Sequence, residues 1–362
     1  MAKSEYDIAI IGAGAAGLGA ACFLSEHRDV VVLEREDQPA YHSSGRSAAL
    51  YIEGYENEVV ADLTIRSGTF FKQPPPFAQH PLLHPRGGLT VATHGEEATM
   101  RAYLQRWQPL CPQLQSIDAE QTLNLVPAIR EEWLTAAAYD PTWLSIDVHE
   151  LLSTYQRGLK HHGGELICDA TVNSLSFDGM WHIETTAGTV RANIVVNAAG
   201  AWAGEIATLA GAVPIDLTPM RRTAALIPPP DGCEQWPLVH TMAETLYFKP
   251  ESPGLMVCPQ DETPSEPTDA FAEELDVAKA MAQLEAVTTI SVQRVLRQWA
   301  GLRTFAPDRR PVVGFDRSAK QFFWLAGQGG FGIQTSPGLG QLVCDNIVNA
   351  APLPGAIQAD RF

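Results

Sequence analysis

The sequence predicts an α/β protein of two domains, in which a domain with a doubly wound parallel sheet carries an inserted α+β domain with a mixed sheet. Three observations predict this. The chain has 362 residues, more than one compact module usually has, and 45% of them are hydrophobic, which suffices for a large core. A strand, a glycine-rich turn, a helix and a second strand follow one another near the beginning. A strand, a glycine-rich loop and a helix recur near residue 330.

The first of these patterns begins with an apolar run over Tyr6–Ile11, which predicts a buried strand. The turn Gly12-Ala13-Gly14-Ala15-Ala16-Gly17 follows, and a helix from Leu18 to Glu26 comes next. A second strand over Val30–Leu33 ends at Glu34. A strand, GxGxxG, a helix, a strand and an acidic residue in this order are typical of a dinucleotide-binding βαβ unit of Rossmann type.

Each position in this unit has a mechanical reason. Gly12 permits the tight turn, Gly14 lets the backbone approach a pyrophosphate, and Gly17 lets the helix pack closely on the strand. The beginning of the helix offers unpaired N–H groups and a positive dipole end to phosphates. Glu34 is placed to accept hydrogen bonds from a ribose. The pattern therefore predicts a bound dinucleotide, and by itself it does not separate FAD from NAD.

Two later segments have the small and polar residues that let a backbone lie against a cofactor. Residues 41–49 (YHSSGRSAA) follow the second strand and offer backbone and hydroxyl donors. Residues 192–196 form an apolar strand that leads into residues 197–204 (NAAGAWAG). Small residues at such a place allow a close approach to a flat ring or a phosphate.

The last pattern is a second site suited to an anion. A strand over Phe322–Ala326 leads into residues 327–332 (GQGGFG), and a helix is expected from about Gly338 to Ala350. The beginning of that helix attracts negative charge. In a flavoprotein it would face the pyrimidine ring of the flavin, where negative charge develops on reduction.

The positions of these patterns divide the chain. Residues 1–50, 150–210 and 310–362 are expected to form the nucleotide-binding domain, and residues 51–149 and 211–309 the inserted substrate-binding domain. Residues 51–149 have the pattern of a largely helical segment with proline-rich joints. In residues 211–309 apolar and polar residues alternate more. This piece predicts a helix over 272–287 and strands over Thr223–Ile227, Thr245–Lys249 and Leu255–Cys258.

Composition excludes several classes of partner. Lys and Arg number 25 against 42 Asp and Glu, and a net charge of −17 repels nucleic acid and anionic membranes. No apolar stretch reaches the length of a membrane span. Met1–Tyr6 lacks the basic and apolar regions of a signal peptide, so a cytoplasmic location is expected, with a peripheral position at the inner face of the membrane left open.

Metal binding and disulfide formation are not expected. No HExxH or CxxC motif occurs, and the cysteines are not paired with histidines at metal-binding spacing. Free thiols in a reducing compartment are the expectation. The six cysteines are Cys22, Cys111, Cys168, Cys233, Cys258 and Cys344.

Four motifs occur in one order along the chain: HSSGRSAA, VVNAAGAW, WAGLRTF and GQGGFGIQTSPG. With the N-terminal fingerprint, they resemble the FAD-dependent D-amino-acid oxidase superfamily, which includes glycine and sarcosine oxidases. The motifs are most similar to those of bacterial D-arginine dehydrogenases. The resemblance covers essentially the whole chain. It implies a glutathione-reductase-type FAD domain and, because no Cys or His stands at a recognisable attachment position, FAD held non-covalently.

The resemblance also implies roles for particular residues. Arg303 would grip the substrate carboxylate, with Arg222 as a second arginine and Tyr247 as a further donor. Tyr55 would lie on a loop that covers the pocket. The carbonyl of Gly330 would receive the substrate amine, with Gln334 near the same place. The residues expected to bind FAD are Gly12, Gly14, Ala15, Ala16, Gly17, Glu34, Arg35, Ser43, Ser44, Gly45, Arg46, Ser47, Ala48, Val172, Ala198, Gly200, Trp202, Gly329, Gly330, Gly332, Ile333, Gln334 and Thr335.

One departure from the resemblance concerns the substrate. Relatives that prefer basic D-amino acids carry an acidic residue after an HPLL segment, and this chain has Gly88 at the matching position. Leu50 and Ile52 are apolar, and His240 stands where relatives are apolar. Neutral or aromatic D-amino acids are therefore expected to be better substrates than D-Arg or D-Lys. A protonated His240 would admit acidic ones.

The implied reaction is oxidative deamination of a D-amino acid by hydride transfer from Cα to the flavin N5. A dehydrogenase that passes electrons to a quinone or another acceptor is favoured. An oxygen-using D-amino-acid or glycine/sarcosine-type oxidase and an FAD-dependent 2-hydroxy-acid dehydrogenase remain alternatives. A non-catalytic FAD subunit and an NAD-dependent dehydrogenase are further, weaker readings. The sequence leaves the oligomeric state open.

Overall fold

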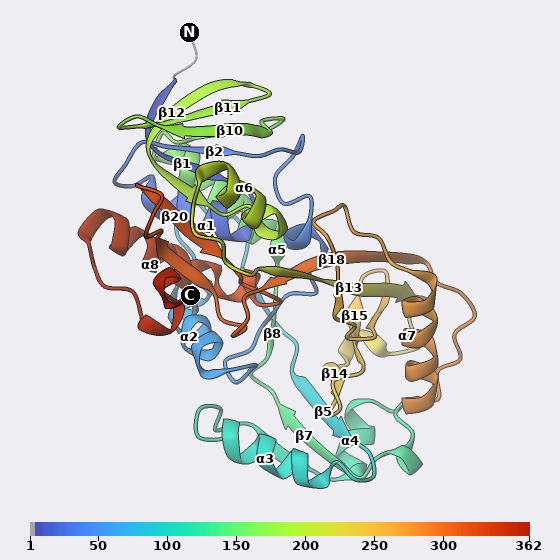
Figure 1. Ribbon diagram of the computed structural model, residues 1–362. Helices are drawn as coiled ribbons and strands as arrows, with labels where there is room; N and C mark the ends of the chain where they lie inside the picture. Colours follow the sequence, from blue (N-terminus) through green and yellow to red (C-terminus); the bar gives the residue numbers. More distant parts are fainter. Residues whose placement is uncertain (1–3) are drawn as a thin grey trace.

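The structure, a computed structural model, describes residues 4–362 and contains two large sheets and one small one (Figure 1). Within these residues the first sheet has eight strands, namely β1 (Glu5–Ile11), β2 (Val30–Leu33), β9 (Glu165–Ile167), β10 (Val172–Phe177), β11 (Trp181–Thr185), β12 (Gly188–Asn197), β19 (Val312–Phe315) and β20 (Phe322–Ala326). Its centre is parallel, in the order β9, β2, β1, β12 and β20. The predicted α/β class and its parallel sheet are confirmed. The expectation about the chain's first residues falls partly on Met1–Lys3, outside the described part.

Helices cover both faces of this sheet because its strands alternate in side-chain direction. Ile8 and Ile10 of β1 contribute to one buried cluster, and Ala9 and Ile11 to the other. The first cluster includes residues of α1 (Ala15–Leu24), α2 (Glu58–Lys72), α5 (Val148–His161) and α8 (Gly332–Asn349). The second includes residues of α6 (Ala203–Ala210). The Rossmann unit is thus buried on both sides.

The second sheet has nine strands among the described residues and extends toward the lower right of Figure 1. They are β5 (Gly88–Ala92), β6 (Gln115–Ile117), β7 (Ala136–Asp140), β13 (Thr218–Ile227), β14 (Leu238–Thr241), β15 (Tyr247–Glu251), β16 (Gly254–Cys258), β17 (Thr263–Pro264) and β18 (Arg297–Phe305). The sheet is mixed, because β14 is parallel to β5 and the remaining pairs are antiparallel. Helix α7 (Glu274–Val287) contacts β13 and β16.

The expectation that residues 51–149 are largely helical is wrong. This segment contains α2, α3 (Glu97–Trp107) and α4 (Ala119–Leu125), but also three strands of the second sheet, β5, β6 and β7. It further supplies most of a three-stranded sheet made of β3 (Leu50–Tyr51), β4 (Leu83–Pro85) and β8 (Leu144–Ile146). These strands have two to five residues and pair with distant segments, so no local periodicity identifies them.

The last helix begins six residues earlier than expected, at Gly332 rather than Gly338. Pro337 lies inside it and has no N–H to give to the carbonyl of Ile333. The hydroxyl of Ser336 donates to that carbonyl instead, at 2.9 Å. The sequence therefore tolerates a proline within the second turn, and Gln334 and Thr335 belong to the helix rather than to the glycine loop.

Candidate active site

Three neighbouring pockets, here called the first, middle and end chambers, share lining residues. The first chamber lies at the ends of β1 and β2, and the middle chamber lies between α1 and β18. The end chamber lies under β14 and the Tyr55 loop. The first and middle chambers share Gly14, Ser43, Ser44, Ala198 and Gly200 as lining residues. The middle and end chambers share Ser47, Ala48, Tyr247, Arg303, Gly330 and Ile333.

The turn after β1 shows why its glycines are needed. Gly12 has φ of 104°, and a Cβ there would lie 2.5 Å from the carbonyl oxygen of Ala198. A Cβ on Gly17 would lie 1.9 Å from the carbonyl oxygen of Gly12. Gly14 lines both the first and the middle chamber. Gly17 therefore acts through packing, and Gly14 through access to the cavity.

Side chains on both sides fix the beginning of α1. The hydroxyl of Ser44 accepts a hydrogen bond from the amide of Ala15 at 2.9 Å. The buried carboxylate of Glu34 accepts from the amides of Ala13 at 2.8 Å and Glu36 at 3.1 Å. Glu34 lines the first chamber as expected, and it also ties the glycine turn to the end of β2.

The outer wall of the first chamber is a cation–aromatic pair. The guanidinium carbon of Arg35 lies 4.7 Å from the ring centroid of Trp202, and Val172 lines the same chamber. Of the residues expected to bind FAD, three line none of the three chambers. They are Gly17, Gly45 and Thr335, whose hydroxyl donates to the carbonyl of Phe331. All the others line at least one chamber.

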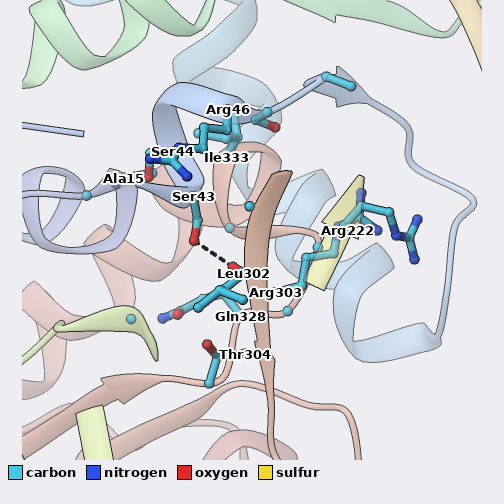
Figure 2. A pocket seen from close by; sticks show the side chains of 18 of the residues that line it. Ala15, Ser43, Ser44, Arg46, Arg222, Leu302, Arg303, Thr304, Gln328 and Ile333 are labelled. Atoms are coloured by element: carbon cyan, nitrogen blue, oxygen red, sulfur yellow. Dashed lines mark hydrogen bonds between the residues drawn. The ribbon is translucent and has the colours of Figure 1, made fainter. Parts of the chain in front are cut away.

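The middle chamber has the Ser43–Ser47 segment on one side and β18 on the other (Figure 2). The hydroxyl of Ser43 donates to the carbonyl of Leu302 at 2.5 Å, the bond dashed in Figure 2. The guanidinium of Arg46 donates to the carbonyls of Ala270 at 2.6 Å and Ala300 at 3.0 Å. This segment therefore joins the first sheet's domain to the second sheet beside the cavity.

Arg303 lies where the middle chamber opens into the end chamber. Its guanidinium has no hydrogen bond or ion pair with any group in residues 4–362. A Cβ on Gly330 would lie 2.8 Å from its Nη1, so the glycine makes room for the guanidinium. The planar fork of donors is thus held in the cavity and available to a ligand.

Arg222 differs from Arg303 in that its charge is already paired. It lines the middle chamber, but its Nε donates to the carbonyl of Asp261 at 2.6 Å and its Nη2 to Glu262 at 3.0 Å. The carboxylate of Glu262 also accepts from Arg309 at 3.1 Å. Arg222 therefore belongs to an ion-pair network at the cavity's edge.

Two tyrosines flank the end chamber. Tyr55 contacts the ring of Phe331, with 5.6 Å between centroids, and Tyr247 lies opposite Cys258 on the neighbouring strand. Burial raises the pKa of both hydroxyls above the ordinary value, against a smaller opposing effect of Arg303. Both tyrosines are therefore protonated hydrogen-bond donors at neutral pH.

The remaining walls of the end chamber include residues that the sequence did not single out. Trp143, Leu238 and Gln260 line it, and their places depend on how β5, β7 and β14 pair, which no local motif reveals. Gln334 also lines it, and its side-chain oxygen accepts from the amide of Ile52 at 3.2 Å. This bond fixes the orientation of the amide at the start of α8.

The cavity fits FAD on two observations. The side-chain nitrogen of Gln328, a middle-chamber residue, is buried without a hydrogen-bond partner. Each of two helices begins beside the middle chamber, α1 at Ala15 and α8 at Gly332, where N–H groups and the positive dipole end favour anions. The sequence profile of the family described as "FAD dependent oxidoreductase" matches residues 7–346. The chain belongs to this FAD-dependent oxidoreductase family. Its cofactor is FAD.

Several relatives resemble the chain over nearly its whole length. Dimethylglycine dehydrogenase of Rattus norvegicus is 26% identical over 387 residues, which cover 99% of this chain and 45% of the relative. The chain thus spans about half the length of that relative. Glycine oxidase of Bacillus subtilis is 24% identical, with 96% of this chain and 94% of the relative covered. The crystal structure of L-proline dehydrogenase from P. horikoshii matches with a TM-score of 0.86 at 20% identity. The match covers 98% of this chain and 96% of that one.

Two further properties concern the described residues as a whole. No helix in residues 4–362 is both long and apolar enough to cross a membrane. The same residues contain no cluster of three or more His, Cys, Asp or Glu side chains arranged to hold a metal ion.

Proposed function

We propose that this flavoprotein oxidises the carbon–nitrogen bond of a small amino acid whose carboxylate is bound by Arg303. The observation that carries the proposal is the unpaired guanidinium at the junction of the middle and end chambers. A guanidinium binds a carboxylate through two parallel hydrogen bonds, each contributing about 1.5–3 kcal/mol. A cation held in a cavity without a protein partner is best explained by an anionic ligand.

The other residues of the junction orient the substrate. Tyr247 supplies a neutral donor beside the carboxylate, and Gly330 is the backbone position expected to receive the amine. Bound FAD supplies the two-electron acceptor for the hydride that leaves the carbon next to nitrogen. The contribution of the chain is mainly to hold that carbon in one place and to keep water away from it.

No strong general base at neutral pH lines the end chamber within residues 4–362. Among the described residues, the titratable groups that line the end chamber are Tyr55, His240, Tyr247 and Arg303. The tyrosines hold their protons because burial raises their pKa, and burial lowers the pKa of His240 to about 4. The substrate amine must therefore lose its proton to solvent before it reacts. The pH dependence of flavin reduction should follow the amine of the substrate.

We further propose that the substrate is a neutral D-amino acid and that the enzyme acts as a dehydrogenase with a quinone or another acceptor. The apolar lining of the end chamber, with Leu50, Ile52, Leu238 and Phe331, supports an uncharged substituent. A glycine substituted on nitrogen is a second candidate. The name of one relative, dimethylglycine dehydrogenase, favours it. In both cases Arg303 binds the same carboxylate.

The test is anaerobic mixing of the FAD-loaded protein with D- and L-amino acids, N-methylated glycines and 2-hydroxy acids, while the flavin absorbance is followed. Bleaching by amino acids supports the proposal, and the subset that bleaches identifies the stereochemistry and the class of amine. Bleaching by hydroxy acids alone, or by no compound, would contradict it. Repeating the best case in air and measuring hydrogen peroxide separates an oxidase from a dehydrogenase.

Replacing the arginine tests its role directly. Arg303→Ala should lower kcat/KM for flavin reduction by at least about 100-fold, because both carboxylate bonds are lost, each at about 1.5–3 kcal/mol. Arg303→Lys should recover only part of this, since a lysine cannot form the bidentate pair. FAD content should stay unchanged. Arg294→Ala, at an exposed position just before β18, is the matched control. Equal activity of the Arg303 and Arg294 variants would refute the assignment.

A further inference from the structure

The far wall of the end chamber is a pair of stacked rings. Trp143 precedes β8, and His240 lies on β14. Their centroids are 5.7 Å apart with an angle of 15° between the planes, and both residues line the chamber. Trp143 is 3% exposed, and His240 is partly exposed as a whole residue.

His240 has no free polar atom to offer a substrate. Its Nδ1 donates to the carbonyl of Thr241 at 3.3 Å, which leaves Nε2 to accept from the hydroxyl of Thr90 at 2.8 Å. Burial keeps the ring neutral, with the pKa lowered to about 4. The imidazole therefore presents ring carbons to the chamber. The expectation that a protonated His240 would admit acidic substrates loses its basis at neutral pH.

The wall exists because residue 88 has no side chain. A Cβ on Gly88 would lie 2.1 Å from the indole Cδ2 and Cε3 of Trp143, so the indole fills the space that a side chain there would take. Gly88 does not have a positive φ. Residue 88 must therefore be glycine so that the indole of Trp143 can pack there, and not because of its backbone conformation.

We infer that Trp143, which packs over Gly88, and the neighbouring His240 set the substituent specificity of the proposed amino-acid oxidation by selecting an uncharged apolar or aromatic group and rejecting charged ones. The inference rests on the proposed function for the identity of the substrate. Its physical reason is that a charged substituent would lose its water against ring carbons and find no opposite charge, since Arg303 holds the carboxylate. An apolar substituent of similar length gains contact area instead.

The experiment compares substituents of similar length on the common amino-acid frame. With the active stereoisomer, kcat/KM for methionine and phenylalanine should exceed the values for lysine and glutamate by at least 100-fold. The binding of unreactive acids is measured in parallel from the perturbation of the flavin spectrum. 3-Phenylpropanoate should bind at least 10-fold more tightly than glutarate or 6-aminohexanoate. A wild-type preference for the charged member in both series would overturn the inference.

Two variants locate the preference at the wall. Trp143→Ala removes the indole, and Gly88→Ala pushes it from its place. Both should lower the ratio of kcat/KM between phenylalanine and alanine by about 10-fold, with FAD content retained. Gly204→Ala is the matched control, because a Cβ there meets nothing within 4 Å. An unchanged ratio in both variants would overturn the inference.

The two measurements separate this inference from the proposed function. Flavin reduction by amino acids with an unaltered ratio in the variants would leave the function standing and remove the role of the wall. A second outcome is that 3-phenylpropanoate binds selectively and binds more weakly in Trp143→Ala, while no amino acid reduces the flavin. This result would support the role of the wall and contradict the proposed function. Absence of both reduction and carboxylate binding would refute both.

Discussion

Two basic side chains line the end chamber, and they differ in charge and in hydrogen bonding. Arg303 has its guanidinium in the cavity without a protein partner, whereas His240 has both ring nitrogens hydrogen-bonded and is held neutral. Arg222, expected as a second arginine of the site, lines the middle chamber and donates to Glu262. Among residues 4–362, Arg303 is thus the guanidinium at the junction that has no protein partner, which suits a substrate with a single carboxylate.

The buried histidine makes stability depend on pH. The pKa of His240 is lowered from 6.5 to about 4, so the unfolded chain binds this proton more readily than the folded one. The contribution of neutral His240 to the free energy of unfolding is fully present above pH 6.5 and is lost as pH falls toward 4. In His240→Gln, the free energy of unfolding with excess FAD should vary less between these pH values than in the wild type. Urea titrations at several pH values check this, with exposed His94→Gln as the control. Parallel curves for His240→Gln and the wild type would contradict it.

We expect cofactor binding to depend on the β1–turn–α1 unit, because its pattern is that of a dinucleotide-binding βαβ unit. Its turn is so close-packed that Gly12 and Gly17 face backbone oxygens at distances no Cβ can occupy. Ser44 accepts from the amide of Ala15 at the start of the helix, and Glu34 accepts from the amide of Ala13 in the turn. A local sequence pattern predicts such an element well, because each requirement lies within one βαβ unit.

One methyl group in this element should abolish cofactor binding. Gly17→Ala places a Cβ 1.9 Å from the carbonyl oxygen of Gly12, and the helix must move away from the strand to relieve the contact. The FAD content of the purified protein should fall by at least 10-fold. Gly355→Ala, where a Cβ meets nothing within 4 Å, should keep full FAD content. Normal FAD content in Gly17→Ala would show that the packing is more tolerant than these distances indicate.

At the scale of the whole molecule, the cavity depends on how the two sheets are joined. Arg46 makes one such connection, because its guanidinium reaches the carbonyls of Ala270 and Ala300 and the carboxylate of Asp269. Its own carbonyl accepts from the indole nitrogen of Trp299 at 3.1 Å. The FAD-binding segment is thus fastened to the strand that carries Arg303.

Removing this connection should loosen the cavity. Arg46→Ala loses charge-assisted bonds to two carbonyls, which costs roughly 2–3 kcal/mol at a partly exposed site. Tm should fall by about 3–4 °C, and FAD should bind at least 10-fold more weakly. Thermal unfolding and a fluorescence titration of the apoprotein with FAD measure the two effects. Arg101→Ala, on the exposed side of α3, is the control. A lower Tm with unchanged FAD affinity would assign Arg46 a purely structural role.

The sequence by itself indicated the βαβ unit, the family and FAD, and it led to the proposal that Arg303 binds a carboxylate. These depend on contiguous motifs, in which local spacing dictates the turn, the helix start and the strand end. The sequence did not predict the strands within residues 51–149, because they are short and pair with segments far along the chain. For the same reason only the tertiary structure decided that Arg222 is paired, that His240 is neutral and that Trp143 fills the space above Gly88. Burial and partners come from packing between distant segments, and those properties set the chemistry of the end chamber.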